Sequence, residues 1–260
     1  MKLNGKVAIV TGGAMGNGLG IVKVFLKYGA EVVIIDYSDK ITNTLQELNS
    51  PKVLGYKADI RDSKMLQAIV NDVIAKKGKI DILVNNAGIA KLEKFIDMTD
   101  EVRNTHFDIN INGTWNMTKA VVPHMVRNNY GKIVNLSSVT GPMVADSGEV
   151  AYATTKAAIL GFTKSLAIEL VQNNINVNAI MPGYIMTPMV DGIAKDTNSN
   201  DPQSVIRGIA NGIPMGRLGT IEELGELAAF LASDESTYIT GQGIVIDGAS
   251  TLPETKSVGV

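Results

Sequence analysis

The fold of this chain is decided by the stretch Val7-Ala8-Ile9-Val10-Thr11-Gly12-Gly13-Ala14-Met15-Gly16-Asn17-Gly18. Its apolar start predicts a buried strand, and the apolar periodicity from Leu19 to Leu26 predicts a helix directly after the glycines. Glycines let the backbone turn tightly, and the free N–H groups at the start of a helix attract a phosphate. The stretch therefore predicts a strand, a dinucleotide-binding turn and a helix, with an ordinary glycine-rich turn as the alternative.

An acidic residue follows the next predicted strand, Glu31 to Ile35. Asp36 comes after Gly18 at close to the ~20 residues expected for the acid that binds the adenosine ribose. Its carboxylate can accept both ribose hydroxyls but repels a 2′-phosphate, and Tyr37 stands where an arginine would attract that phosphate. The sequence therefore favours NAD over NADP, although a turn residue or helix cap gives the same pattern.

Strands and helices then alternate along the chain. Further strands are predicted at 52–57, 80–84, 132–136, 175–180 and 243–247, and helices at 63–77, 100–128, 152–171 and 220–232. Such alternation builds a parallel sheet with helices on both faces, so we predict one Rossmann-type, doubly wound α/β domain over residues 1–260, with about seven parallel strands. The irregular segment 184–214 is a candidate substrate lid or an idle surface loop.

Composition limits the class of function. Of 260 residues, 45% are apolar and 19% charged, the formal charge is −2, and no basic block suggests nucleic acid or an anionic membrane as partner. The absence of cysteine and the presence of only two histidines argue against zinc and thiolate chemistry. No signal-peptide pattern or long apolar run is seen, so we predict a cytoplasmic protein that acts on a small molecule.

A tyrosine and a lysine, Tyr152 and Lys156, lie one turn apart in a predicted helix. Positions i and i+4 share one helix face, so the phenol and the ammonium can point into the same space. A nearby cation favours the phenolate and moves the pKa of the phenol from ~10 toward neutrality. The pair suits acid–base catalysis, but a surface lysine beside a half-buried tyrosine gives the same spacing.

A series of short motifs carries a resemblance to a known family. The series is Thr11-Gly12-x-x-x-Gly16-x-Gly18, Asp59, Asn85-Asn86-Ala87-Gly88, Asn110-x-x-Gly113, Ser138, Tyr152-x-x-x-Lys156, Pro182-Gly183 and Thr187. In this order the motifs resemble the short-chain dehydrogenase/reductase family, from the glycine turn to the last strand. The resemblance implies a nicotinamide cofactor and reversible hydride transfer between a secondary alcohol and a ketone.

The resemblance also implies catalytic roles. Tyr152 would be the general acid/base, Lys156 would lower its pKa and hold the nicotinamide ribose, and Ser138 would bond the substrate oxygen. Asn110 would hold a water that connects Lys156 to solvent. The preceding serine, Ser137, competes with Ser138, which is preferred because it directly precedes the Val-Thr-Gly turn.

The same resemblance implies how a cofactor is held. Adenine would lie near Asp59 and Ile60, and the nicotinamide amide near Ile185 and Thr187. The implied cofactor-binding residues are Gly12, Met15, Gly16, Asn17, Gly18, Asp36, Asp59, Ile60, Asn86, Ala87, Gly88, Tyr152, Lys156, Pro182, Gly183, Ile185 and Thr187. Asn17 departs from the family, which usually has an apolar residue there, and we expect a small effect because backbone N–H groups hold the phosphate.

The substrate pocket is the least determined part. The residues expected to line it are Ser138, Met143, Asp146, Glu149, Tyr152, Tyr184 and Met189. Apolar walls with two carboxylates suggest a polar substrate, such as a polyol or keto-sugar, held by Asp146 or Glu149. The alternative is that both acids face water or cap the helix.

Two other functions are open on the sequence. A dinucleotide-binding sensor without turnover would keep the fold, although it would need no proton relay. An NADPH-dependent ketoacyl reductase would need NADPH and a basic docking surface, and Asp36 and the net charge count against it. The resemblance further implies a homotetramer, in which the helices that carry Trp115 and Phe162 pack between subunits.

Overall fold

The strands form one parallel sheet. A computed structural model describes residues 1–253, with the backbone alone at Met189, Ile193 and Asp196. Within these residues the seven strands lie in the order β3-β2-β1-β4-β5-β6-β7. They are β1 Val7–Thr11, β2 Glu31–Asp36, β3 Val53–Lys57, β4 Ile82–Asn85, β5 Gly131–Leu136, β6 Ile175–Pro182 and β7 Gly243–Ile246. The predicted doubly wound sheet is confirmed.

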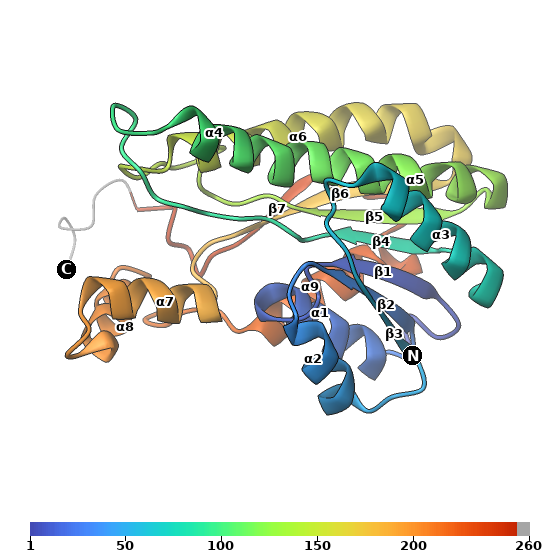
Figure 1. Cartoon of the computed structure of the whole chain (residues 1–260), viewed down its shortest axis with the longest axis horizontal. Helices are drawn as coiled ribbons and strands as arrows, with labels where there is room; N and C mark the ends of the chain where they lie inside the picture. Colours follow the sequence, from blue (N-terminus) through green and yellow to red (C-terminus); the bar gives the residue numbers. More distant parts are fainter. Residues whose placement is uncertain (254–260) are drawn as a thin grey trace.

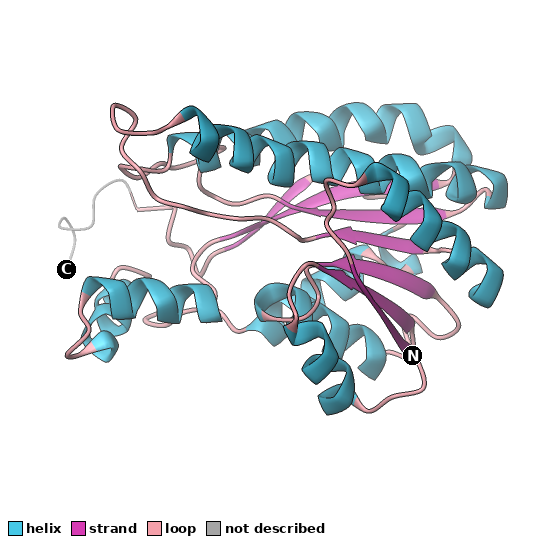
Figure 2. Ribbon diagram, viewed as in Figure 1, coloured by secondary structure: helices cyan, strands magenta, loops and turns pink. Residues whose placement is uncertain are grey.

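Helices cover both faces of the sheet (Figures 1 and 2). One face carries α1 Gly16–Lys27, α2 Lys40–Leu48 and α9 Ile221–Leu231. The other carries α3 Ser63–Lys77, α4 Asp100–His106, α5 Thr114–Asn128 and α6 Val150–Leu170. The sequence analysis did not predict α2, in which polar residues predominate. Among the described residues, no helix combines the length and apolar character needed to span a bilayer.

Alternating side chains of β1 belong to two separate halves of the core. Val10 packs in a cluster with Phe25 of α1, whereas the preceding residue, Ile9, packs with Leu66 of α3. The period of two residues places successive side chains on opposite faces of a strand. Both faces are buried, and each large apolar side chain contributes roughly 1.5–3 kcal/mol. The strands β1 and β4 are therefore almost wholly apolar, whereas β5 and β6 also carry buried polar residues, Lys132, Asn135, Asn176 and Asn178.

The glycine turn joins β1 to α1 by a very close backbone approach. Gly12 has a φ of +65° and Gly16 a φ of +54°, in the left-handed region that favours glycine. A Cβ atom on Gly18 would lie 2.1 Å from the carbonyl oxygen of Gly12, so no side chain fits there. The turn thus starts α1 directly at the carboxyl edge of the sheet.

The helix predicted at 100–128 contains a π-helical segment, Phe107–Gly113, between α4 and α5. The wider turn interrupts the regular bonds, and the Thr114 hydroxyl donates to the carbonyl oxygen of Asn110 at 2.9 Å. Asn110 is buried, whereas Asn112 stays at the surface and donates to Asp108. The segment therefore turns Asn110, rather than Asn112, toward the interior.

The segment 184–214 follows β6 and forms two helices, α7 Pro188–Thr197 and α8 Pro202–Asn211. Figure 1 shows them together, beside the edge of the sheet and away from the other helices. Val190 of α7 and Ile206 and Ile209 of α8 belong to a small separate apolar cluster, which Ile213 and Leu218 complete from the chain after α8. The segment is thus a compact unit placed where the strands end.

Candidate active site

Tyr152 and Lys156 lie on the inward face of α6, where the helix passes the end of β5. The Lys156 nitrogen is 5.6 Å from the centre of the Tyr152 ring and donates to the carbonyl oxygen of Leu136 at 2.8 Å. Lys156 is buried, with 7% of its surface exposed. The structure therefore brings the predicted pair together at the carboxyl edge of the sheet.

The two serines that follow β5 have different surroundings. The Ser137 hydroxyl donates to the backbone carbonyl of Lys156 at 2.7 Å, so it is committed to holding α6 against the sheet. The Ser138 oxygen accepts from the Thr140 N–H at 3.1 Å, and its own donor has only a long contact, 3.5 Å, with the Pro182 carbonyl. Ser138 also lies close enough to the Tyr152 phenol to act on its pKa, in the lowering direction. The geometry thus favours Ser138 over Ser137 as a substrate contact.

Burial shifts the pKa values of both Tyr152 and Lys156. It raises the pKa of Tyr152, while the hydrogen bond with Ser138 opposes the rise and the Glu149 carboxylate adds to it. Burial lowers the pKa of Lys156 to about 8. The expected lowering of the Tyr152 pKa by Lys156 is therefore not found. The Lys156 ammonium lies 5.6 Å from the ring centre and is directed at Leu136 instead.

Asn110 connects three parts of the site. Its side-chain oxygen accepts from the Ile89 N–H at 2.9 Å, and its amide donates to the Ile89 carbonyl at 3.0 Å and to the Thr155 hydroxyl at 2.9 Å. Every polar atom of this side chain thus has a protein partner. The side chain joins the loop after β4 to α6 beside Lys156.

A cleft of about 340 Å³ runs along the carboxyl ends of β1, β2, β3 and β4. The lining residues are Met15, Ile35, Asp36, Tyr37, Ala58, Asp59, Ile60, Arg61, Ala87, Gly88, Ile89, Thr105 and Ile109. The carboxylate of Asp36 accepts from the N–H groups of Ala14 and Ser38, both at 2.9 Å. Each oxygen thus accepts one hydrogen bond among the described residues and has the capacity for a second, so Asp36 can still accept from a ribose.

Asp59 and Asn86 each make hydrogen bonds within the protein. Asp59 is held by Arg61, whose guanidinium contacts both carboxylate oxygens and keeps the pKa of Asp59 below its ordinary value. The Asn86 amide donates to the carbonyls of Thr11 and Gly12, both at 3.0 Å. Asp59 can meet adenine only beside Arg61, and Asn86 stabilises the glycine turn itself.

The glycine turn fits a dinucleotide. The first turn of α1 contains no acidic residue, and a Cβ on Gly16 would lie 3.7 Å from Thr187 at the start of α7. The side-chain oxygen of Asn17 is buried without a hydrogen-bond partner among the described residues. Free N–H groups, close backbone approach and a cleft beside Asp36 are what a pyrophosphate and its ribose require.

The remaining cofactor residues lie where β6 ends. Pro182 is the last residue of β6, and Gly183 follows against Asp247 at a distance that leaves no room for a Cβ. Ile185 is buried and pairs with Gly219 in an isolated bridge. Thr187 caps α7. These residues form the side of the site that faces the segment 184–214.

The residues expected to line the substrate pocket differ in their exposure. Met143 and Tyr184 are each almost half exposed. The pKa of Tyr184 is raised mainly by burial, and the nearby charges of Asp146 and Glu149 raise it further. Asp146 is exposed, whereas one Glu149 oxygen is buried without a hydrogen-bond partner among the described residues. Burial, and then Asp146, raise the pKa of Glu149. The Met189 side chain lies outside the described part of the chain.

Several residues of the cleft were not predicted. Arg61 follows Asp59 by two positions, and its charge beside an acid was the available signal. Thr105 and Ile109 line the cleft from the helix face next to that of Asn110. Their spacing of one turn was visible, but the π-helical segment that aims this face was not.

Comparison with known proteins identifies the fold family. The family model described as enoyl-(acyl carrier protein) reductase matches residues 12–251. Oxidoreductase UcpA of Salmonella typhimurium is 54% identical over 100% of this chain and 99% of its own length. This chain belongs to the short-chain dehydrogenase/reductase family. It is an oxidoreductase, and the family uses nicotinamide dinucleotide cofactors.

Other members of the family are similar over nearly the whole chain. The 3-oxoacyl-[acyl-carrier-protein] reductase FabG of Thermotoga maritima is 39% identical over 97% of this chain and 100% of its own. The ligand-free structure of an aldohexose dehydrogenase from Thermoplasma acidophilum has a TM-score of 0.92 at 30% identity, covering 99% of this short-chain dehydrogenase/reductase and 98% of its own chain. The relatives thus differ in substrate on one shared fold.

The buried amine of Lys156 should make stability depend on pH. Its pKa is about 8 in the folded chain and 10.5 in the reference state, so the unfolded chain binds the proton more tightly between these values. Stability therefore rises as pH increases through this window, and the cost of the buried charge is complete below pH 8. In thermal unfolding without dinucleotide, the melting temperature of Lys156→Met minus that of the wild type should be higher at pH 7 than near pH ~10.

The exposed lysine of the same helix provides the control. Lys164→Met removes an equal charge from the surface of α6. A difference between Lys156→Met and wild type that stays constant with pH would contradict the buried-amine interpretation.

Proposed function

We propose that this chain is an NAD(H)-dependent dehydrogenase that interconverts a secondary alcohol and a ketone. The observation that carries the proposal is the meeting of Ser138, Tyr152 and Lys156 at the end of β5, beside a cleft that contains Asp36. The three side chains supply a hydrogen-bond donor, a proton and a cation in one place. A dinucleotide sensor would need only the cleft.

The proposed chemistry divides between Ser138 and Tyr152. When bound, a nicotinamide supplies or accepts the hydride at the substrate carbon. In the reducing direction the Tyr152 phenol donates its proton to the substrate oxygen, and in the oxidising direction it takes the proton back. The raised pKa of Tyr152 keeps the phenol protonated, which suits donation. The loosely held Ser138 hydroxyl can turn to bond the same oxygen.

Lys156 and Asn110 support the proton transfer. The Lys156 ammonium has three donors and uses one on Leu136, so two remain for the hydroxyls of a ribose. The Asn110 side chain is fully bonded, which leaves its backbone carbonyl, the acceptor of the Thr114 hydroxyl, as the other polar group of this residue. That carbonyl is the atom we assign to the water of the proton route.

Removal of the Tyr152 hydroxyl should abolish turnover without abolishing cofactor binding. Tyr152→Phe keeps the buried ring but has no proton to give, so kcat should fall by roughly 10²–10⁴-fold. NADH binding, followed by nicotinamide fluorescence, should stay near wild type because the glycine turn and Asp36 are unchanged. Turnover of a panel of alcohols and ketones at the wild-type rate would exclude Tyr152 as the acid/base.

Asp36 supports the choice of NAD. Its carboxylate lies in the cleft, and a 2′-phosphate there would meet a like charge. Asp36→Asn should increase the affinity for NADPH relative to NADH by roughly tenfold, the factor that ~1.4 kcal/mol corresponds to. Fluorescence titration with both cofactors measures the ratio.

The matched control is Asp39→Asn. Asp39 lies three positions further on and pairs with Lys57 at the surface. Its loss should leave the ratio unchanged. Tighter binding of NADPH than NADH by the wild-type protein would instead favour the ketoacyl reductase alternative, which FabG of Thermotoga maritima represents among the relatives.

We propose a polar, hydroxylated substrate held by Glu149. Its buried oxygen without a partner needs a donor, and Glu149 lies one turn before Tyr152 on the way into α6. Asp146, which is exposed, is the weaker candidate. The aldohexose dehydrogenase of the same fold acts, by its name, on a polyhydroxylated aldehyde sugar, which agrees with a hydroxyl-rich substrate class.

Replacement of Glu149 should discriminate between substrates. Glu149→Ala should raise KM for the best hydroxylated ketone or polyol by roughly tenfold, because a hydrogen bond to a charged group is worth ~1.5–3 kcal/mol. KM for a matching ketone without the second hydroxyl should not change, and Asp146→Ala serves as the exposed control. An equal effect of Glu149→Ala on both ketones would refute the contact.

The segment 184–214 and the outer helices complete the proposal. We assign α7 and α8 the role of a lid, since Thr187 at the start of α7 lies against the glycine turn. Trp115 is 56% exposed and stacks on Phe162 with ring centres 5.4 Å apart, which supports a homotetramer with these helices between subunits. Light scattering would test this assembly, and a monomer would contradict it.

A further inference from the structure

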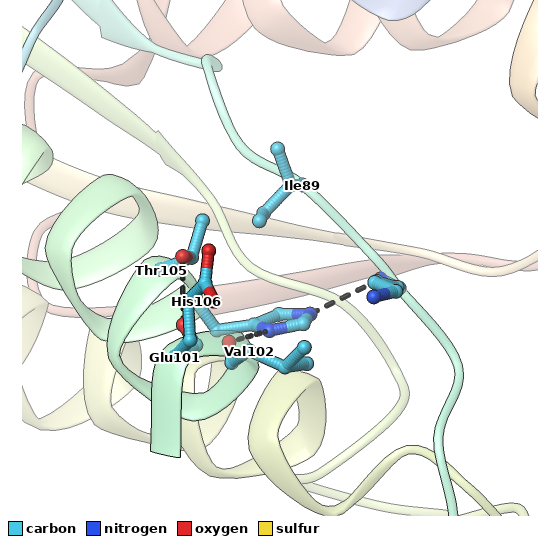
Figure 3. A pocket seen from close by; sticks show the side chains of 6 residues that line it. Ile89, Glu101, Val102, Thr105 and His106 are labelled. Atoms are coloured by element: carbon cyan, nitrogen blue, oxygen red, sulfur yellow. Dashed lines mark hydrogen bonds between the residues drawn. The ribbon is translucent and has the colours of Figure 1, made fainter. Parts of the chain in front are cut away.

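His106 is fully buried at the end of α4, and both of its ring nitrogens are hydrogen-bonded. Nε2 lies 3.1 Å from the Lys91 N–H, and Nδ1 lies 2.8 Å from the carbonyl oxygen of Val102. Figure 3 shows the ring directed from the helix toward the loop that carries Ile89. A backbone N–H can only donate and a carbonyl can only accept, so Nε2 is the acceptor and Nδ1 carries the proton.

His106 and Asn110 act on the same short piece of backbone. They are four positions apart on one helical element and both face the loop after β4. Asn110 bonds the N–H and the carbonyl of Ile89, and His106 bonds the N–H of Lys91. Residues 86–94 belong to no helix or strand, so these side chains take the place of regular backbone pairing.

This piece of backbone lies between the dinucleotide cleft and the catalytic lysine. Gly88 and Ile89 line the cleft, and a Cβ on Gly88 would lie 3.6 Å from the Lys156 nitrogen. On its other side is a cavity of about 170 Å³, which His106 lines together with Ile89, Lys91, Glu101, Val102 and Thr105. A cavity gives the loop room to move if its bonds are lost.

We infer that His106 is a positioning residue, which holds the backbone of Lys91 through Nε2 and, together with Asn110, fixes residues 88–91 at the distance from Lys156 that the cofactor requires. The inference rests on the proposed function for its effect on turnover. The clamp itself is a property of the chain. An apolar residue would fill the same space beside the loop but would offer the Lys91 N–H no acceptor in place of Nε2.

Two polar substitutions separate the ring nitrogens. His106→Gln places an amide oxygen near the position of Nε2 and can accept from Lys91, whereas His106→Asn reaches only the position of Nδ1. His106→Leu removes both bonds. If the acceptor at Nε2 matters, His106→Gln should retain the properties of the wild type, whereas His106→Asn should resemble His106→Leu. If His106 only fills space, the two amides should behave alike.

Hydrogen–deuterium exchange of peptides within 86–94 gives a readout that does not depend on activity. Exchange should be ~tenfold faster in His106→Asn and His106→Leu than in wild type, and near wild type in His106→Gln. NADH affinity should fall about fivefold in the same two variants, as expected for one net hydrogen bond. The kcat measured at saturating NADH should fall in the same order, with Gln the least affected.

The outcomes separate the two proposals. Wild-type exchange in His106→Asn, or equal impairment in Gln and Asn, would overturn the clamp. A third outcome is that exchange is slow in the wild-type protein and fast in His106→Asn, but that the wild-type protein binds no NADH. This outcome would support the clamp and reject the proposed function. Because the chain has two histidines, ring ¹⁵N spectra of the wild-type protein also decide without any variant. A proton on Nε2 of His106 would overturn the inference.

Discussion

Two reciprocal hydrogen bonds between α6 and the end of β5 determine where the chemistry of this protein can occur. The Lys156 side chain donates to the carbonyl of Leu136, and the Ser137 side chain donates to the carbonyl of Lys156. Both bonds are buried, where a polar group without a partner is costly. They fix the position of α6 relative to the end of β5, and this position brings Tyr152 close to Ser138.

The cost of this arrangement is a buried amine. A lysine that is almost fully buried resists protonation, so its pKa falls to about 8 and it lies close to the range in which a proton can be exchanged near neutral pH. The same burial raises the pKa of Tyr152. The two pKa values therefore move apart, because burial favours the neutral form of each group, the protonated phenol and the deprotonated amine.

Much of the fold was predictable, because buried parallel strands are largely apolar and their helices follow a regular period. Four features were not. Helix α2 is short and mostly polar, although Ile41, Leu45 and Leu48 recur in it at helical spacing, and the π-helical segment from Phe107 depends on one extra residue in a turn. The pairing of Asp59 with Arg61 and the clamp made by His106 depend on which side chain lies nearest, which spacing does not specify.

The sequence by itself determined the sheet, the glycine turn and the set of polar residues that follow the strands. The backbone path of the turn requires glycine at Gly12, Gly16 and Gly18, and parallel strands bring their carboxyl ends to a common edge. Tertiary structure alone decided which of these residues are free to act. The side chains of Ser137 and Asn86 donate their hydrogen bonds to backbone carbonyls. Ser138 and Asp36 can still form further hydrogen bonds. Three-dimensional contact decides this difference, because it determines which groups become hydrogen-bond partners.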